Sequence, residues 1–451
     1  MAELTLAELA DAVRTREVSP VELAGEYLAR IDRGNEKVGA YLTVDHEGAL
    51  EAAREAEALV MSGTRDLPAL CGVPVSVKDT WPVKGLRYTA GSKVFADRVA
   101  EVDAAVVTQL RRAGMVVLGK TNAAEFGCSS YTETAFGPAR NPHDRTRTAG
   151  GSSGGAAASV AAGLAPVAHG SDGGGSVRIP AACCGLVGIK PTRGRVSPVP
   201  GADSAGLATA GPIARTVADA ALLLDVMSTA RPGDVHQLPP TPAGHFLNSA
   251  SRDPGRLRIG VLRGPRTEDP QCRQACDDTA ELLADLGHDV EEAAPSGPDD
   301  YRAEFTVVWS VLAGSVPVPD EREQDLLPLT RWLREKARGY DALTFMSALA
   351  SMQATARRIA DRYDRFDVVL SSTTATLPPL VGGLVDADPA RTFENMLEFH
   401  PLTPLANITG QPSMTIPAHQ DGLPVGVLLT GRYGAEATVI SVAAQLERAQ
   451  R

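Results

Sequence analysis

Two serines in glycine-rich turns are the residues whose types and spacing could do chemistry. Ser152 follows Gly150 and Gly151, and Ser176 follows three further glycines. A serine hydroxyl is a poor nucleophile until a neighbouring base takes its proton. A flexible Gly/Ser linker has no reason to hold the Ala- and Val-rich run that separates the two turns. The stretch 148–192 is therefore the first candidate for a catalytic block.

The first turn formally matches GxSxG, the nucleophile elbow of α/β-hydrolases, through residues 150–154. That motif needs a strand immediately before the serine. Residues 144–149 are polar instead, and the histidine that should follow late in the chain could only be His400 or His419. A five-residue pattern in a glycine-rich chain is a weak signal. The sequence therefore does not favour an α/β-hydrolase.

Phosphate and metal sites are also poorly supported. The glycines at 173–175 could bind an anion, but no GxxxxGK[ST] spacing exists, and Lys190 is followed at once by Pro191. The histidines are scattered, and Cys272 with Cys276 would supply only two metal ligands. We expect neither a metal nor a cofactor, and we interpret these two cysteines as packed helix residues.

Residues 150–192 resemble the signature block of the amidase signature family, which has a GGSSGG turn, a small-residue helix, a DxGGS turn and a PAAxCGxxGxKPT tail. This resemblance implies a Ser–cis-Ser–Lys triad for amide hydrolysis through an acyl-enzyme. Ser176 would be the nucleophile, Ser152 the bridging serine and Lys78 the general base, with its pKa lowered by burial. Similar motifs occur in the family's order at 75–79, 118–122, 139–142, 404–407, 410–412 and 422–426.

The same resemblance implies further roles around the two turns. Asp172 would anchor the second turn by accepting backbone donors, and Ser153 would assist Ser152 through a hydrogen bond. For Lys120 and Arg178 we expect structural ion pairs. Converging backbone N–H groups would form the oxyanion hole. These donors would belong to Gly173, Gly174, Gly175 and Ser176.

Pocket residues follow only from position in the family. The family usually has a larger residue where Gly173 stands, so we expect a looser oxyanion loop here. The family often has an aromatic residue where Cys183 stands, and the smaller cysteine would leave space behind that loop. The substrate-pocket candidates are Tyr131, Thr132, Phe136 and Trp309.

Helices and strands must carry these residues. Helix start signals occur at Thr5 and Ser19. Strand-like segments at 72–77 and 115–118 flank a helix-like segment at 103–113, and such alternation is typical of a sheet covered by helices. With the resemblance, this predicts an α/β protein of the amidase signature fold, a large twisted mixed β-sheet covered on both faces by helices (α/β/α).

We predict one amidase domain over residues 1–451. It would contain an N-terminal helical layer (1–65), the signature core (70–195) and a helical insertion near the substrate cleft (296–365). The remaining predicted helices are 47–61, 156–163, 217–227 and 436–449, and the remaining predicted strands are 257–262, 367–370 and 425–430.

Composition restricts the partners. A net charge of −11 argues against nucleic acid and anionic membrane surfaces. The first ten residues carry Glu3 and Glu8 without a basic stretch, which is unlike a signal peptide, and no apolar run could span a bilayer. The cysteines form no CxxC pair. We therefore expect a cytoplasmic enzyme with a small-molecule amide substrate, and a homodimer stays open.

Two alternatives are kept. The first is the glutaminase subunit of an amidotransferase, which shares the fold and triad and passes ammonia to a partner. That subunit usually has Gln after the arginine of its GGSxRQP segment, whereas Ile179 follows Arg178 here. The second is an inactive family member that acts as a scaffold, against which the complete triad argues.

Overall fold

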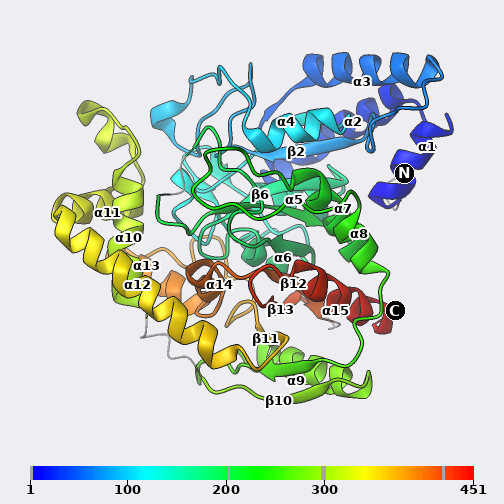
Figure 1. The fold of residues 1–451 in the computed structure, drawn as a ribbon. Helices are drawn as coiled ribbons and strands as arrows, with labels where there is room; N and C mark the ends of the chain where they lie inside the picture. Colours follow the sequence, from blue (N-terminus) through cyan, green and yellow to red (C-terminus); the bar gives the residue numbers. More distant parts are fainter. Residues whose placement is uncertain (1–3, 202–203, 296–300, 419–421, 451) are drawn as a thin grey trace.

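A mixed β-sheet runs through the middle of the protein (Figure 1). The computed structural model describes residues 4–201, 204–295, 301–418 and 422–450, so His419 and the predicted start of the insertion at 296–300 lie outside the described residues. Within them, eleven strands form the order β1-β3-β2-β6-β8-β7-β12-β13-β11-β9-β10. Their bounds are β1 Tyr41–Val44, β2 Pro74–Lys78, β3 Val116–Thr121, β6 Val167–Asp172, β7 Val187–Lys190, β8 Thr209–Ala214, β9 Arg258–Val261, β10 Asp289–Glu292, β11 Val368–Ser372, β12 Ser413–Ala418 and β13 Val425–Gly431.

Helices cover both faces of this sheet. Every residue of β2, β3 and β8 is buried, as expected for central strands packed on two sides. The helices are α1 Leu6–Arg14, α2 Pro20–Val38, α3 His46–Met61, α4 Ala105–Arg112, α5 Gly154–Ala161, α6 Arg178–Cys183, α7 Val217–Met227, α8 His245–Ala250, α9 Pro270–Asp285, α10 Arg302–Gly314, α11 Pro328–Arg338, α12 Ala342–Tyr363, α13 Pro389–Phe399, α14 Thr403–Thr409 and α15 Glu436–Ala449. The predicted α/β class is confirmed.

Local sequence signals explain the N-terminal layer. Thr5 and Glu8 form a reciprocal capping box at the start of α1. Ser19 caps α2, where Pro20 takes the first helical position. Both predicted starts are confirmed, and α3 extends the predicted third helix by one residue.

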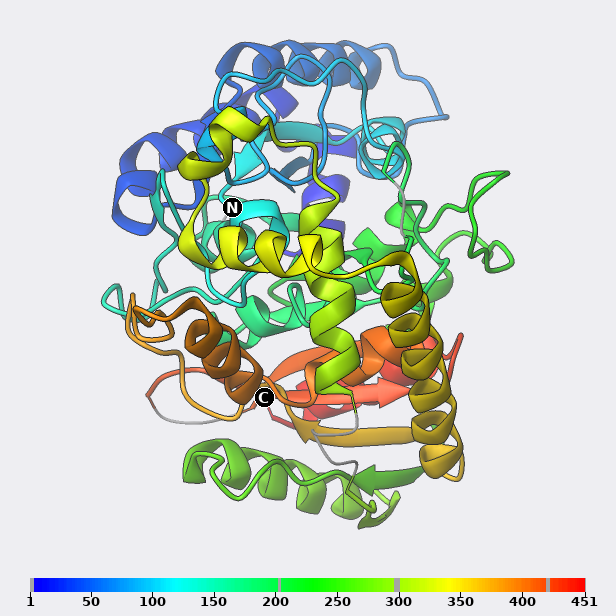
Figure 2. The same ribbon diagram turned by 90° about the vertical axis from the view of Figure 1, so that its left-hand side faces the viewer.

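The insertion between β10 and β11 contains α10, α11 and α12, and α10 packs against the other two helices (Figure 2). In the described part of the chain, no helix is long and apolar enough to cross a membrane. The same part contains no group of three or more His, Cys, Asp or Glu side chains that could hold a metal ion. Cys272 and Cys276 are buried on α9.

Candidate active site

Two neighbouring parallel strands, β2 and β6, bring the site residues together where their carboxyl ends meet. Strand β2 pairs with β6 so that Val77 lies opposite His169. The carboxyl ends of parallel strands lie at the same edge, so Lys78 at the end of β2 comes close to the end of β6. Ser152 lies in the turn before α5, after a cis peptide bond with Gly151.

Lys78 is fully buried and points at hydroxyl groups. Its Nζ lies 2.7 Å from Ser152 Oγ and 3.0 Å from Ser171 Oγ. Burial lowers the pKa of Lys78 to about 7, although the negative charge of Asp172 opposes this shift. Near neutral pH a large share of Lys78 is therefore unprotonated and able to accept a proton.

Ser171 is a site residue that the sequence analysis missed. It belongs to β6 and lines the same cavity as Ser152 and Ser176. A strand prediction for Val167–Asp172 could have placed Ser171 near Lys78. This run is too polar, however, to be recognised from the sequence as a core strand.

The turn that carries Ser152 is packed closely against a preceding segment. A Cβ at Gly151 would lie 2.5 Å from the Tyr131 carbonyl carbon, so only glycine fits there. The Gly154 N–H donates to Thr132 Oγ1 (3.1 Å), and this hydroxyl donates weakly to Ser152 O (3.4 Å). Tyr131 and Thr132 therefore support the turn from behind.

Ser153 bonds to Ser171 and not to Ser152. Its hydroxyl donates to Ser171 O (3.2 Å) and accepts from Ser171 N–H (3.3 Å), while its own N–H donates to Ser176 O (3.2 Å). The expected assistance to Ser152 is thus replaced by a link between the Ser152 turn, the end of β6 and the Ser176 loop.

A buried ion pair holds the loop that carries Ser176. Asp172 accepts from Arg178 Nε (2.9 Å) and Nη2 (2.8 Å), and Asn407 Nδ2 donates to the same carboxylate (2.9 Å). Burial alone would raise the pKa of Asp172, but Arg178 and Asn407 together lower it well below its usual value. The structural ion pair expected for Arg178 is confirmed, as is that of Lys120 with Asp79. Breaking such a buried pair leaves an uncompensated charge, typically worth about 3–5 kcal/mol.

The Gly174–Gly175 peptide is held at both ends. The Gly175 N–H donates to Asp172 Oδ1 (2.8 Å), and Thr403 Oγ1 from α14 donates to Gly174 O (2.8 Å). Thr403 in turn contacts His400 Nδ1 (3.2 Å). Of the four expected oxyanion donors, Gly175 therefore already has an intramolecular acceptor.

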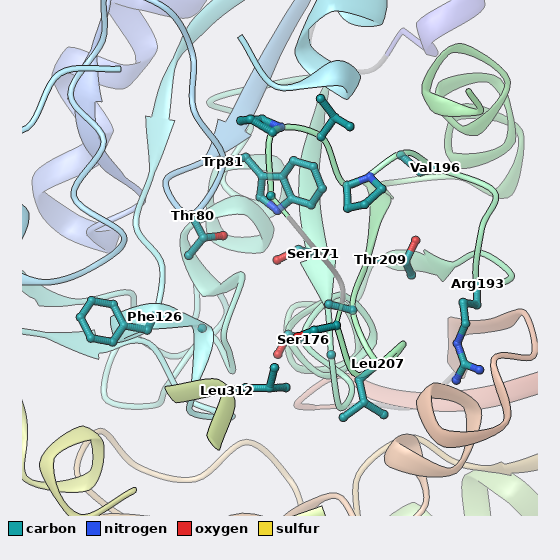
Figure 3. A pocket seen from close by; sticks show the side chains of 18 of the residues that line it. Thr80, Trp81, Phe126, Ser171, Ser176, Arg193, Val196, Leu207, Thr209 and Leu312 are labelled. Carbon is teal, nitrogen blue, oxygen red and sulfur yellow. The ribbon is translucent and has the colours of Figure 1, made fainter. Parts of the chain in front are cut away.

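A cavity of about 790 Å³ opens beside these residues, and Ser152, Ser171, Gly173 and Ser176 line it. Figure 3 shows Ser171 and Ser176 facing this cavity from below Trp81, with Leu312 and Leu207 around Ser176. The remaining walls come largely from residues 80–82, 126–128, 193–201 and 309–313. Its lining exposes more apolar than polar surface, which suits a small organic substrate.

The structure places only one of the four pocket candidates on the wall of this cavity. Trp309 lines the cavity, whereas Tyr131, Thr132 and Phe136 do not. Phe136 lies in the hairpin between β4 (Glu133–Thr134) and β5 (Gly137–Pro138) and is 36% exposed.

Comparisons with known proteins agree over nearly the whole chain. The Amidase family profile matches residues 22–440. The 6-aminohexanoate-cyclic-dimer hydrolase of Paenarthrobacter ureafaciens is 36% identical over 482 residues, which cover 98% of this chain and 93% of that protein. A glutamyl-tRNA(Gln) amidotransferase subunit of Acidothermus cellulolyticus is 37% identical over 484 residues, which cover 99% of this chain and 94% of that protein.

Solved structures agree as well. The structure of 6-aminohexanoate cyclic dimer hydrolase matches with a TM-score of 0.91 at 33% identity, covering 100% of this chain and 97% of that one. The resemblance found in the signature block is thereby confirmed. The chain belongs to the amidase signature family and is an amidase, a hydrolase that acts on the carbon–nitrogen bond of amides.

Proposed function

We propose that the chain hydrolyses small-molecule carboxamides through an acyl-enzyme on Ser176. The observation that carries this proposal is the contact between buried Lys78 and Ser152, on the wall of the cavity that Ser176 also lines. Neutral Lys78 takes the Ser152 proton while Ser152 takes the Ser176 proton, and Ser176 Oγ bonds to the amide carbon. The proton returns through Ser152 to the departing nitrogen as the C–N bond breaks. Water then attacks the ester and releases the acid, which restores Ser176.

The negative oxygen of the tetrahedral intermediate needs donors fixed in advance. We assign this task to the N–H groups of Gly173, Gly174 and Ser176. The Gly175 N–H instead keeps the loop in shape through Asp172, which supports the anchoring role proposed for that carboxylate.

A free-standing amidase is favoured over a glutaminase subunit. Ile179 is buried, and its Cδ1 would lie 2.7 Å from a Cβ at Gly175, so this position packs the loop and offers no polar group. The inactive-scaffold alternative predicts no turnover of any amide. The cytoplasmic location and a homodimer stay predictions.

The acyl-enzyme is tested with a small apolar fluorophosphonate followed by peptide mass spectrometry. We expect one adduct per chain, on the peptide that contains Ser176, because an activated serine alone reacts at neutral pH. The Ser176→Ala variant should take up no label, and Ser249→Ala, which changes a buried serine on α8, should label normally. Labelling of Ser152 in preference to Ser176 would contradict the assigned nucleophile.

Thr403 should affect the rate through the loop. Thr403→Val keeps the shape but removes the bond to Gly174 O, so we expect kcat to fall about tenfold, the size of one well-placed hydrogen bond. Thr403→Ser should recover most of kcat, and KM should change less than kcat in both variants. Thr409→Val is the control on the same helix, because Thr409 Oγ1 donates within α14, to Leu405 O. Equal losses in the Val and Ser variants would show that the hydroxyl has no such role.

A further inference from the structure

The loop that carries the nucleophile is covered by an aromatic side chain of the insertion. A Cβ at Gly173 would lie 3.1 Å from Trp309 Cη2 and 3.2 Å from Cζ3, so the indole ring occupies the space that a side chain at Gly173 would need. The sequence predicts a looser loop, because the family usually has a larger residue at this position. In the structure the missing side chain is replaced by the ring of Trp309.

This ring is held in one orientation. It stacks on Phe305 with centroids 5.1 Å apart and an interplanar angle of 16°, and its Nε1 donates to Cys128 O at 3.1 Å. Phe305 in turn lies beside Gly174, where a Cβ would be 3.4 Å from its ring. A flat surface fixed in advance binds a flat partner with little loss of side-chain entropy.

The walls next to Trp309 are apolar. Leu312 and Ala313 continue the Trp309 wall along α10, and Trp81 also lines the cavity. Trp81 meets His169 edge-on at 5.3 Å, and burial lowers the pKa of His169 to about 3, so its ring is neutral near pH 7. An uncharged ring in the substrate could enter this part of the cavity without the free-energy cost of removing a charged group from water.

Arg193, whose side chain carries a positive charge, lines a different wall of the cavity. Arg193 lies in the 193–201 segment, and Figure 3 draws it apart from Leu312. Its Nη2 donates to Asn407 O (2.7 Å) and Ile408 O (2.9 Å), so this charge is directed at carbonyl groups of α14. The wall formed by Trp309 and Leu312 therefore stays the apolar side of the cavity.

We propose that the enzyme prefers amides that carry an uncharged aromatic ring next to the amide group, and that Trp309, seated on Gly173, determines this preference by stacking on that ring. The inference rests on the proposed function because it places the ring beside Ser176. It adds the substrate class, which the triad alone leaves open.

The test compares kcat/KM for three uncharged amides. Benzamide has its ring on the acyl side, acetanilide has it on the amine side, and propionamide has no ring. We expect the wild type to favour at least one ring substrate over propionamide by about tenfold or more, as one aromatic contact can provide. Loss of preference for benzamide alone in the variants places the ring on the acyl side, and loss for acetanilide alone places it on the amine side.

Three variants address Trp309 directly. Trp309→Ala should lower the ring-to-propionamide ratio about tenfold, and Trp309→Phe should keep most of that ratio because it retains a flat ring. Gly173→Ala should lower the ratio without removing the indole, because its methyl group would push the ring away from the loop by a few tenths of an ångström. Trp332→Ala is the matched control, since Trp332 lies on α11, packs against Phe393 and does not line the cavity.

A ratio that stays within twofold of wild type in both Trp309→Ala and Gly173→Ala overturns the inference, with thermal melting used to confirm that each variant is folded. Gly173→Ala keeps the test valid if Trp309→Ala does not fold. Fluorophosphonate labelling of Ser176 separates the two proposals. Normal labelling with an unchanged ratio rejects the ring preference alone, whereas turnover of propionamide by Ser176→Ala rejects the proposed function itself.

Discussion

Alanine at position 176 is expected to lower kcat for amide hydrolysis by about 10⁴-fold or more, as removal of the catalytic serine does in serine hydrolases. Ser176 is only 7% exposed, and its carbonyl, which accepts the Ser153 N–H, stays in place in Ser176→Ala. The loop geometry should therefore survive while the nucleophile is lost. KM should change little, because the walls of the cavity are untouched.

Steady-state kinetics on one good amide substrate measure this effect. Ser249→Ala should retain wild-type kcat, since it makes the same chemical change on α8, where the hydroxyl bonds to His245 O. A Ser176→Ala enzyme within tenfold of wild type would mean that Ser176 is not the nucleophile.

Replacing Lys78 should cost nearly as much. Lys78→Met removes the base and Lys78→Arg keeps a charge that cannot be given up near neutral pH, so we expect both to lower kcat by about 10³-fold or more. An arginine variant with substantial activity would show that this side chain acts by its positive charge and not as a base.

The direction in which kcat/KM changes with pH tests whether Lys78 acts as a base. Only unprotonated Lys78 can accept the Ser152 proton, so kcat/KM should rise through the lysine pKa of about 7 and level off above it. Burial also lowers the pKa of Lys190 to about 7, so this lysine could produce a similar inflection. Lys190→Met is therefore the matched control, and it should keep the rise. A profile that falls between pH 6 and 8 would contradict a neutral base.

The burial that lowers the pKa of Lys78, the proposed base, should also cost the protein stability. Between pH 7 and the usual lysine range near 10.5, the unfolded chain binds more protons at Lys78 than the folded chain, so the contribution of Lys78 to the free energy of unfolding rises with pH. Lys78→Met should be at least as stable as wild type at pH 7, and its advantage should shrink toward pH 10.5. Thermal melting across this range would show this trade between activity and stability.

Elements with strong local signals could be predicted from the sequence. Capping residues placed α1 and α2, and continuous apolar runs placed β3 and β13. Strand β6 was missed because three of its last four residues, His169, Ser171 and Asp172, are polar and disturb the apolar pattern of a core strand.

The same distinction holds for the site. Lys78, Ser152 and Ser176 could be named because they lie in contiguous motifs. Asn407 lies in the motif at 404–407 and Thr403 directly precedes it, but their roles could not be assigned. Their contacts with the loop join residues more than two hundred positions apart, and only tertiary packing places α14 there. The segment around Tyr131 was assigned to the pocket, but the close approach at Gly151 uses it to support the turn.

The network around Asp172 also has a consequence for synthesis on the ribosome. Thr403, Asn407 and the strands β12 and β13 all follow the three residues of the proposed triad in the chain, so they are synthesised later. A nascent chain that ends before α14 holds Lys78, Ser152 and Ser176, but it lacks both the Thr403 bond to Gly174 O and the β12 partner of β7. We therefore expect hydrolytic activity to emerge only after α14 and β12 have been synthesised.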